Sequence, residues 1–140
     1  MAVLRREILE RKLAFLQQFL TDLEGYARLD TANRRKNHYA IERLLQLLCE
    51  SAVDIGLQVL KKRGSGLAGS YREVFSTLHR LGALPEKLAD GLVDACGMRN
   101  VLTHLYDRID LDRVVAAVDP ALVLYGQYLE LALEEVAGWD

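Results

Sequence analysis

The sequence predicts an all-α protein, an up-and-down helical bundle with two long helices and several shorter ones. Three observations support this fold class. Only two prolines occur among the 140 residues, the β-branched residues are scattered rather than alternating, and the apolar residues recur at steps of three and four. The length suits one domain, residues 1–140, built around one hydrophobic core.

The N-terminal segment predicts the first long helix. Its leucines alternate between four- and three-residue steps, as along the seam of an amphipathic helix, at Leu9, Leu13, Leu16, Leu20 and Leu23. Gly25 and the polar stretch 30–33 then interrupt the pattern. We therefore expect the first helix to end near Gly25.

A second long helix is predicted from the next apolar pattern. Its main face consists of Ile41, Leu45, Leu48, Ala52, Ile55 and Val59. Leu44 and Leu47 widen this face, so we expect the helix to be buried on more than one side. Asp54 lies on the same helix. We expect it to be a core carboxylate with satisfied hydrogen bonds; the alternative is a supporting group for an active site.

Residues 64–69, Gly-Ser-Gly-Leu-Ala-Gly, have the form G-x-G-x-x-G. A dinucleotide site of this form requires a strand before it and a helix after it, within a βαβ unit. The preceding segment is predicted to be helical. The stretch is therefore interpreted as a flexible connector, and no cofactor is expected.

Turn residues divide the rest of the chain into further helices. A short helix is expected from about Ser70 to Leu81, stopped by Gly82, and Pro85 suits the first turn of the next helix. That next helix carries residues 99–106, where several polar side chains interrupt the apolar pattern.

The last part of the sequence predicts one more helix. Asp107 and Asp110 mark the end of the preceding helix and a new N-cap, and the pair 119–120, Asp-Pro, does the same for a final helix over 121–136. The packing face of this final helix would consist of Leu122, Tyr125, Leu129 and Val136.

The composition argues against a membrane or secreted protein. Hydrophobic residues make up 51% and charged residues 27% of the chain, as in an ordinary soluble globule. No uninterrupted apolar run approaches the length of about 18 residues that a membrane span needs. Residues 1–10 mix charges with apolar residues and lack a signal-peptide core. We expect a cytoplasmic protein with no membrane contact.

The cysteines and histidines predict no metal site. Cys49 and Cys96 both lie in apolar helical patterns. They could pair, but two buried reduced thiols are expected in a cytoplasmic protein. His38, His79 and His104 are far apart in the sequence and show no zinc-ligand spacing.

The net charge of −2 gives no overall attraction for nucleic acid, so any attraction must come from local clusters. One candidate is Arg34, Arg35 and Lys36 with His38; the other is the basic run 61–63. The run 61–63 is expected to neutralise the C-terminal end of a helix dipole. The first cluster lies near a helix start, where positive charge is mildly unfavourable, and a functional role is better supported there.

Residues 99–106, Arg-Asn-Val-Leu-Thr-His-Leu-Tyr, concentrate polar groups in an apolar helix. At about 100° per residue, Tyr106 falls about 20° from Arg99. Asn100 and Thr103 lie beside them, and His104 lies at the edge of the same arc. The guanidinium suits phosphate oxygens, and the imidazole can take and give a proton near neutral pH. The residue types alone leave open that Arg99 and His104 merely cap and solvate one side of the helix.

The stretch 99–106 resembles the R-x4-H-x-Y signature of the HepT-like branch of the HEPN superfamily. These proteins are ribonuclease toxins paired with MntA-type nucleotidyltransferase antitoxins. The resemblance runs from about Arg34 to the C-terminal helix, and further stretches carry it: residues 39–46 with 54–56, residues 70–75 with 81–84, and residues 106–110. Thr103 departs from the family, in which many members have an aliphatic residue at this position.

The resemblance implies a helical bundle of HEPN type and the toxin of a type VII-like toxin–antitoxin pair. It implies a metal-independent endoribonuclease in which His104 takes the proton of a ribose 2′-hydroxyl and Arg99 neutralises the charge on the phosphoryl oxygens. Asn100 would orient His104 or the substrate. The products would be a 2′,3′-cyclic phosphate and a 5′-hydroxyl.

The resemblance also implies partners and regulation. Relatives form dimers that bring two signatures to a shared cleft, so we expect a homodimer. The antitoxin would transfer AMP to Tyr106, and the added bulk and charge would exclude RNA; the alternative is that Tyr106 only stacks within its turn. Two other functions stay open: a non-catalytic partner that binds nucleotide or substrate for a minimal nucleotidyltransferase, and a structural dimeric adaptor.

Overall fold

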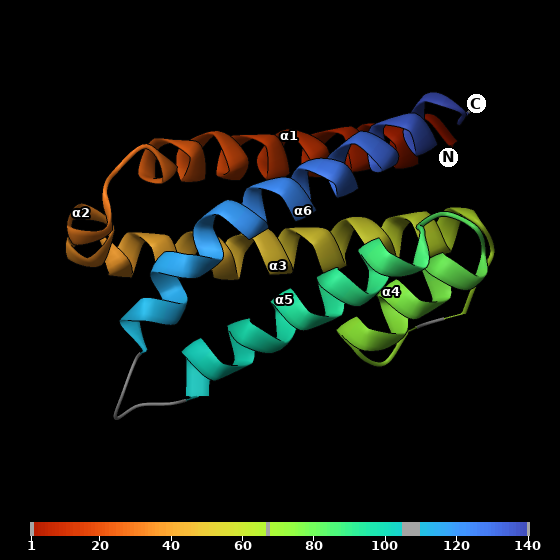
Figure 1. The fold of residues 1–140 in the computed structure, drawn as a ribbon. Helices are drawn as coiled ribbons and strands as arrows, with labels where there is room; N and C mark the ends of the chain where they lie inside the picture. Colours follow the sequence, from red (N-terminus) through yellow and green to blue (C-terminus); the bar gives the residue numbers. More distant parts are fainter. Residues whose placement is uncertain (1, 67, 105–109, 140) are drawn as a thin grey trace.

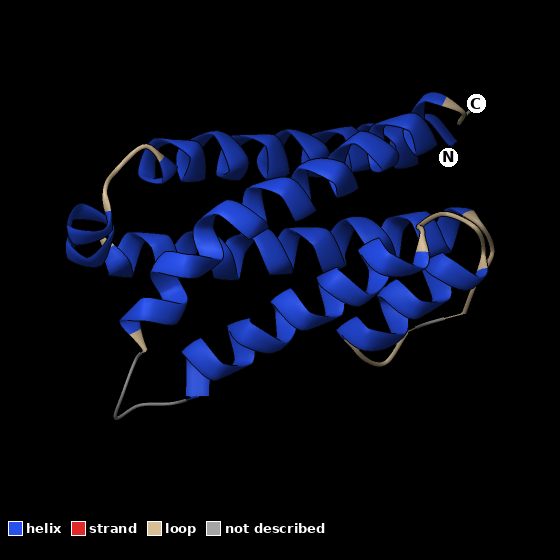
Figure 2. Cartoon of the chain, viewed as in Figure 1, coloured by secondary structure: helices blue, strands red, loops and turns tan. Residues whose placement is uncertain are grey.

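The computed structural model describes residues 2–66, 68–104 and 110–139, and the side chains of residues 4–66, 68–98 and 110–139. These parts contain helices and loops but no strand (Figure 2). The predicted all-α class is confirmed. The helices are α1 (Ala2–Ala27), α2 (Thr31–Lys36), α3 (His38–Lys62), α4 (Tyr71–Arg80), α5 (Glu86–His104) and α6 (Leu111–Ala137).

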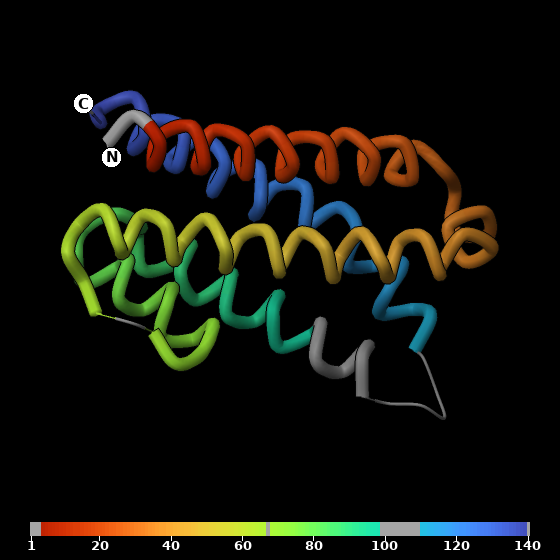
Figure 3. The backbone as a smooth tube through the Cα atoms, turned by 180° about the vertical axis from the view of Figure 1, so that it is seen from behind, coloured from red at the N-terminus to blue at the C-terminus, as the bar shows by residue number. Residues whose placement is uncertain are grey.

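The helices form an up-and-down bundle around α3. Helices α1 and α3 lie side by side and run in opposite directions, and α6 packs against both (Figure 1). The α4–α5 hairpin covers another side of α3, as the view from behind also shows (Figure 3). The two chain ends lie together at one end of the bundle (Figure 1). Helix α2, the start of α6 and the end of α5 lie at the other end.

The core is built from the predicted helical faces. Every leucine of the predicted α1 seam and every residue of the main α3 face is buried. Tyr128 of α6 brings a hydroxyl into this apolar interior, and that hydroxyl donates a hydrogen bond to the Ala52 carbonyl at 2.7 Å. Burial, with a smaller effect of Tyr125, raises the pKa of Tyr128, so the phenol stays neutral and keeps donating.

Side chains at the helix ends confirm several predicted boundaries. Ser70 caps α4 by accepting from the Glu73 amide, while the Glu73 carboxylate accepts from Gly69, a reciprocal capping arrangement. Gly82 follows α4 with φ at +78°, a conformation that favours glycine. Asp110 caps α6 through bonds from two backbone amides. Asp107 lies outside the described residues.

The predicted break before Ala121 is wrong, because α6 continues through Pro120. Proline removes one backbone donor from a helix and crowds the preceding turn. Here the turns on both sides are held by packing, with Val114, Val118 and Ala121 buried. The tertiary contacts of α6 therefore outweigh the local preference to stop at the proline.

Helix α6 is long and apolar enough, by length and composition alone, to cross a membrane. Nine of its residues are nevertheless buried in the bundle, and it packs against both α1 and α3.

Two sequence expectations about side chains on α3 are also wrong. Cys49 forms a disulfide with Cys96 of α5, with the two Cα atoms 5.4 Å apart, so the cysteines are not separate reduced thiols. Asp54 is exposed rather than part of the core, and its carboxylate lies 2.5 Å from the ammonium of Lys12 on α1. Asp54 faces solvent because it lies on the side of α3 opposite its apolar stripe.

Candidate active site

The signature begins in the last turns of α5. Arg99, Asn100 and His104 all belong to this helix, which ends at His104. Their side chains are outside the described part of the structure, and Tyr106 lies outside the described residues altogether. The described residues nearest to the signature end of α5 lie on α2, α3 and α6.

A disulfide fixes α5 to α3 just before the signature. Cys96 comes three residues before Arg99, and its partner Cys49 lies in the middle of α3. Both cysteines are buried. Because α3 and α5 run in opposite directions (Figure 1), the N-terminal half of α3 is the part that accompanies the C-terminal turns of α5.

That half of α3 begins with a histidine–carboxylate pair. The Nδ1 atom of His38 lies 2.6 Å from Oε2 of Glu42, and their side chains are only 19% and 12% exposed. An ionised carboxylate can only accept, so Nδ1 carries the hydrogen and Nε2 is the other ring nitrogen. The sequence predicted His38 to be part of a basic cluster and indicated no role for Glu42. The spacing of four residues on a helix was the available signal.

Next to this pair, an aromatic ring is open to solvent. Tyr39 is 76% exposed, and its ring centroid lies 4.0 Å from that of His38. Lys36, at the end of α2, is also exposed and forms no ion pair among the described residues. An exposed ring in contact with an imidazole, with a lysine three residues before it in the sequence, is suited to a nucleobase and a phosphate.

The predicted basic cluster at α2 is otherwise used for structure. Arg34 donates to the Ala27 carbonyl at 2.7 Å and to the Val115 carbonyl at 3.2 Å, and it pairs with Asp119. Arg35 pairs with Asp112 of α6. The expectation that this cluster attracts nucleic acid is thus wrong for Arg34, whose guanidinium is occupied by protein acceptors.

The second basic run lies at the C-terminal end of α3, at the end of the bundle away from the signature (Figure 1). Arg63 pairs with Glu135 and donates to the Leu81 carbonyl at 2.8 Å. Lys62 lies 5.7 Å from the ring centroid of Trp139. Arg63 is therefore held by contacts with other helices instead of being simply solvated, as was expected for this run.

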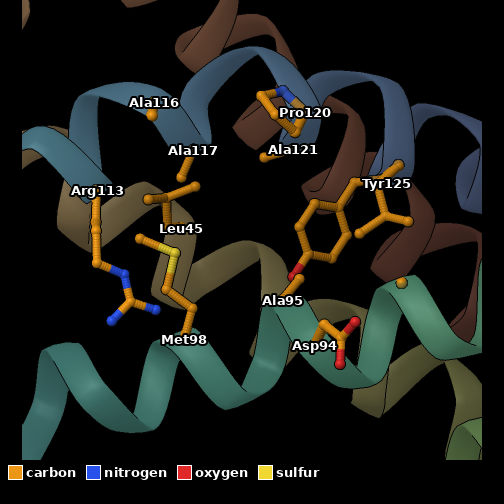
Figure 4. Close-up of a pocket in the computed structure, with 12 residues that line it drawn as sticks. Leu45, Asp94, Ala95, Met98, Arg113, Ala116, Ala117, Pro120, Ala121 and Tyr125 are labelled. Carbon is orange, nitrogen blue, oxygen red and sulfur yellow. The ribbon is translucent and has the colours of Figure 1, made fainter.

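A groove of about 520 Å³ runs between α5 and α6 and ends beside the signature. Leu45 of α3 lies behind it, and Met98, the residue before Arg99, contributes one wall (Figure 4). The lining is mostly apolar. Its charged members are Arg113 on α6 and Asp94 on α5, which approach it from different positions along the groove (Figure 4).

Among the side chains that the structure describes, no group of three or more His, Cys, Asp or Glu residues could hold a metal ion. The described part of this end of the bundle offers an imidazole–carboxylate pair, an exposed phenol ring and the exposed ammonium of Lys36. Such groups can bind a ribose phosphate and transfer protons.

Comparisons with known proteins give the same picture. Residues 9–135 match the family described as Ribonuclease HepT-like. The chain is 32% identical over 125 residues to the tRNA nuclease HepT of Aphanizomenon flos-aquae, covering 87% of this chain and 85% of that protein.

Two solved structures share the fold. A crystal structure of a toxin–antitoxin with AMP-PNP has a TM-score of 0.79 at 22% identity, covering 89% of this chain and 97% of that one. The tri-AMPylated Shewanella oneidensis HEPN toxin in complex with MNT antitoxin has a TM-score of 0.63 at 24% identity, covering 93% and 94%. The bundle is therefore of HEPN type, as the resemblance implied.

Proposed function

Because this chain belongs to the Ribonuclease HepT-like family, we propose that it is the ribonuclease toxin of a toxin–antitoxin pair. Its partner would be an MntA-type nucleotidyltransferase antitoxin, and both would act in the cytoplasm. The observation that carries the proposal is the family match over residues 9–135, which includes the signature that begins on α5. The named nuclease among the relatives and the toxin–antitoxin fold neighbours support it.

The proposed reaction is endonucleolytic and needs no metal. His104 removes the proton of a ribose 2′-hydroxyl, and the 2′-oxygen attacks the adjacent phosphorus. Arg99 stabilises the charge that develops on the phosphoryl oxygens, a contribution of about 3–4 kcal/mol for one well-placed donor. Asn100 orients His104 or the substrate. The P–O5′ bond breaks and leaves a 2′,3′-cyclic phosphate and a 5′-hydroxyl.

We propose a homodimer contact on the surface between α1 and α3. Phe15 is 57% exposed, stacks on Phe19 with centroids 6.4 Å apart, and lies with Ile8 and Leu47 around a cavity of about 340 Å³ whose other lining residues are charged or polar. Exposed aromatic patches of this kind mark protein interfaces. A two-fold contact would also bring two signatures into one assembly.

Tyr106 would be the regulatory residue, modified by AMP from the antitoxin. The AMPylated toxin among the fold neighbours supports this assignment. Adenylate would add bulk and negative charge seven residues after Arg99 in the sequence, and both would keep an RNA phosphate away. Mass spectrometry of the chain co-expressed with its antitoxin should locate AMP on Tyr106, and Tyr106→Phe should stay unmodified and toxic.

The decisive experiment is RNA cleavage by purified chain free of AMP, in the presence of a chelator. We expect the wild type to cut tRNA or mRNA to ends with 2′,3′-cyclic phosphates, and Arg99→Ala and His104→Ala to leave the RNA intact. Folding of both variants is checked by circular dichroism. An unmodified wild-type chain that cuts neither RNA would contradict the proposal.

One observation favours a second function, that of a non-catalytic partner which binds nucleotide or substrate for a nucleotidyltransferase. The groove between α5 and α6 is large enough for a nucleobase and carries Arg113 for a phosphate. This function predicts nucleotide binding without cleavage. The same purified chain, titrated with AMP and incubated with RNA, separates the two.

A further inference from the structure

The proposed cleavage requires two proton transfers. The 2′-oxygen loses a proton while the leaving 5′-oxygen gains one, and a single imidazole cannot do both in one step. Given the nuclease proposed above, on which this inference rests, we propose that His38 is the general acid that protonates the 5′-oxygen. Glu42 would be the positioning residue that holds its ring.

Helix register brings His38 and Glu42 to the face of α3 that meets α5. Helical periodicity places both within about 20° of Cys49, the residue joined to α5. On α5, positions 100 and 103 fall within about 40° of Cys96 and positions 99 and 104 within about 80°. The disulfide therefore marks two stripes that continue toward the same end of the bundle.

Residues of the two stripes also lie at equal distances from the disulfide along the helix axes. Glu42 lies seven residues before Cys49, and position 103 lies seven residues after Cys96. Both are thus about 10 Å from the disulfide along antiparallel helices. The axes of α3 and α5 diverge toward this end (Figure 1), as is required if a phosphate is to lie between groups on the two helices.

The contacts of His38 suit a proton donor rather than a surface charge. Its Nδ1–H donates to Glu42 at 2.6 Å, and both side chains are mostly buried. A carboxylate on Nδ1 holds that hydrogen and fixes the ring orientation. The hydrogen on Nε2 is then the one available for transfer.

The neighbours of His38 could bind the nucleotides on either side of the reacting phosphate. The ring of Tyr39 is open to stack on a base, and Lys36 is free to pair with a neighbouring phosphate. Neither residue has a role in the core. We expect both residues to contact RNA if His38 does.

The step balances within one chain. The 2′-O–H proton passes to His104, the 2′-oxygen–phosphorus bond forms, and the phosphorus–5′-oxygen bond breaks. The Nε2 proton of His38 passes to the 5′-oxygen. His104 ends as imidazolium and His38 as neutral imidazole, and proton exchange with water restores both. The competing source of this proton is His104 of a second copy of the chain.

A sulfur-substituted RNA tests the assignment. The cleaved linkage is first mapped with wild-type chain, and the same RNA is then made with sulfur in place of the bridging 5′-oxygen. A thiolate leaves without protonation, because thiols are far more acidic than alcohols. Loss of a general acid is therefore repaired in this RNA, whereas loss of folding, binding or the general base is not.

We expect His38→Asn to slow cleavage of the ordinary RNA by about 10²–10⁴-fold, and the sulfur RNA to bring the rate within about tenfold of wild type. Glu42→Gln should show a smaller loss with the same repair. His104→Ala should stay inactive on both RNAs. The matched control is His79→Asn, which changes a histidine of α4 that bonds the Leu84 carbonyl at 2.9 Å, and it should cut normally.

Three outcomes would overturn the assignment. A normal rate for His38→Asn on ordinary RNA assigns the acid to the second copy's His104 or to another group. A loss that the sulfur RNA does not repair makes His38 a folding or binding residue, which thermal melts of His38→Asn and His38→Gln distinguish. A wild-type chain that leaves both RNAs intact overturns the nuclease proposal itself.

Discussion

Arg34 on α2 pairs with Asp119 on α6, with Nη1 3.1 Å from Oδ2, across 85 residues of sequence. The same guanidinium donates to carbonyls of Ala27, Leu29 and Val115. One planar side chain thus joins the end of α1, the short α2 and the turn of α6 just before its proline. Among the described side chains, it connects three segments at the signature end of the bundle.

Replacing Arg34 should therefore cost more than replacing its neighbour. Arg34→Ala leaves several carbonyls and Asp119 without their donor, and we expect the free energy of unfolding to fall by roughly 2–3 kcal/mol. Arg35→Ala removes an exposed pair with Asp112 and should cost less than about 1 kcal/mol. Urea titrations followed by circular dichroism measure both; equal losses would contradict the structural role of Arg34.

The Cys49–Cys96 disulfide should change both the intact mass and the melting temperature of the protein. It closes a separation of 47 residues, for which chain entropy gives about 4 kcal/mol, and 2–4 kcal/mol is typical. We expect the non-reduced intact mass to show two hydrogens fewer than the sequence, and reductant to lower the melting temperature. The Cys49→Ala, Cys96→Ala variant should be insensitive to reductant. Two free thiols in air-oxidised protein would refute the bridge.

Two glycines should respond in opposite directions to alanine. A Cβ at Gly56 would meet Val74 Cγ1 at 2.5 Å, where α3 and α4 approach closely. We expect Gly56→Ala to destabilise by about 1–3 kcal/mol. At Gly126 of α6 nothing lies within 4 Å, so Gly126→Ala should stabilise by up to about 1 kcal/mol. Thermal melts of the pair decide whether close packing or helix propensity governs each position.

Glu135 should make stability depend on acid pH. Burial alone would raise the pKa of Glu135, but hydrogen bonds from Arg63 and Trp139, with the charge of Arg63, hold the pKa below its usual value. The ionised form thus stabilises the fold above the unfolded pKa of about 4.3. The stability difference between wild type and Glu135→Gln should be constant near neutral pH and shrink as the pH falls below that value. A stability difference between the two proteins that grows on acidification would contradict this prediction.

The proposed homodimer face can be tested on one residue of α1. Phe15→Glu puts a charge into the exposed aromatic patch, and we expect it to convert dimers into monomers in light scattering after gel filtration. Val123→Glu is the control, since Val123 is 62% exposed on α6, away from this patch. Dimers that survive Phe15→Glu and dissociate with Val123→Glu would move the interface to α6.

Periodicity in the sequence predicted the fold class and the core because each seam is a local pattern. The leucines of α1 and the apolar face of α3 follow from three- and four-residue spacing, and Ser70 and Asp110 follow from capping chemistry. The signature was found because five chemically distinct side chains fall within eight residues. That residues 1–140 form one domain stays a prediction.

What sequence reasoning missed depends on contacts between distant segments. Arg34 has the appearance of a free cation until Asp119 and Val115 are brought to it. Pro120 has the appearance of a helix stop because packing on both sides of it is not visible locally. The pairing of Cys49 with Cys96 depends on the register of α3 against α5. The roles of Arg99, His104 and Asn100, and of Tyr106, stay predictions.

Arg6 near the start of α1 donates to the Trp139 carbonyl at 2.9 Å, so the two ends of the chain are held together far from the last turns of α5 (Figure 1). A tag, a surface linker or a fluorescent fusion at either end would stand clear of an RNA bound at the signature. A short peptide could also join the two ends, and the chain could then be opened in the glycine-rich connector. Such a permuted chain would keep every helix, and its new ends would lie in the connector between α3 and α4.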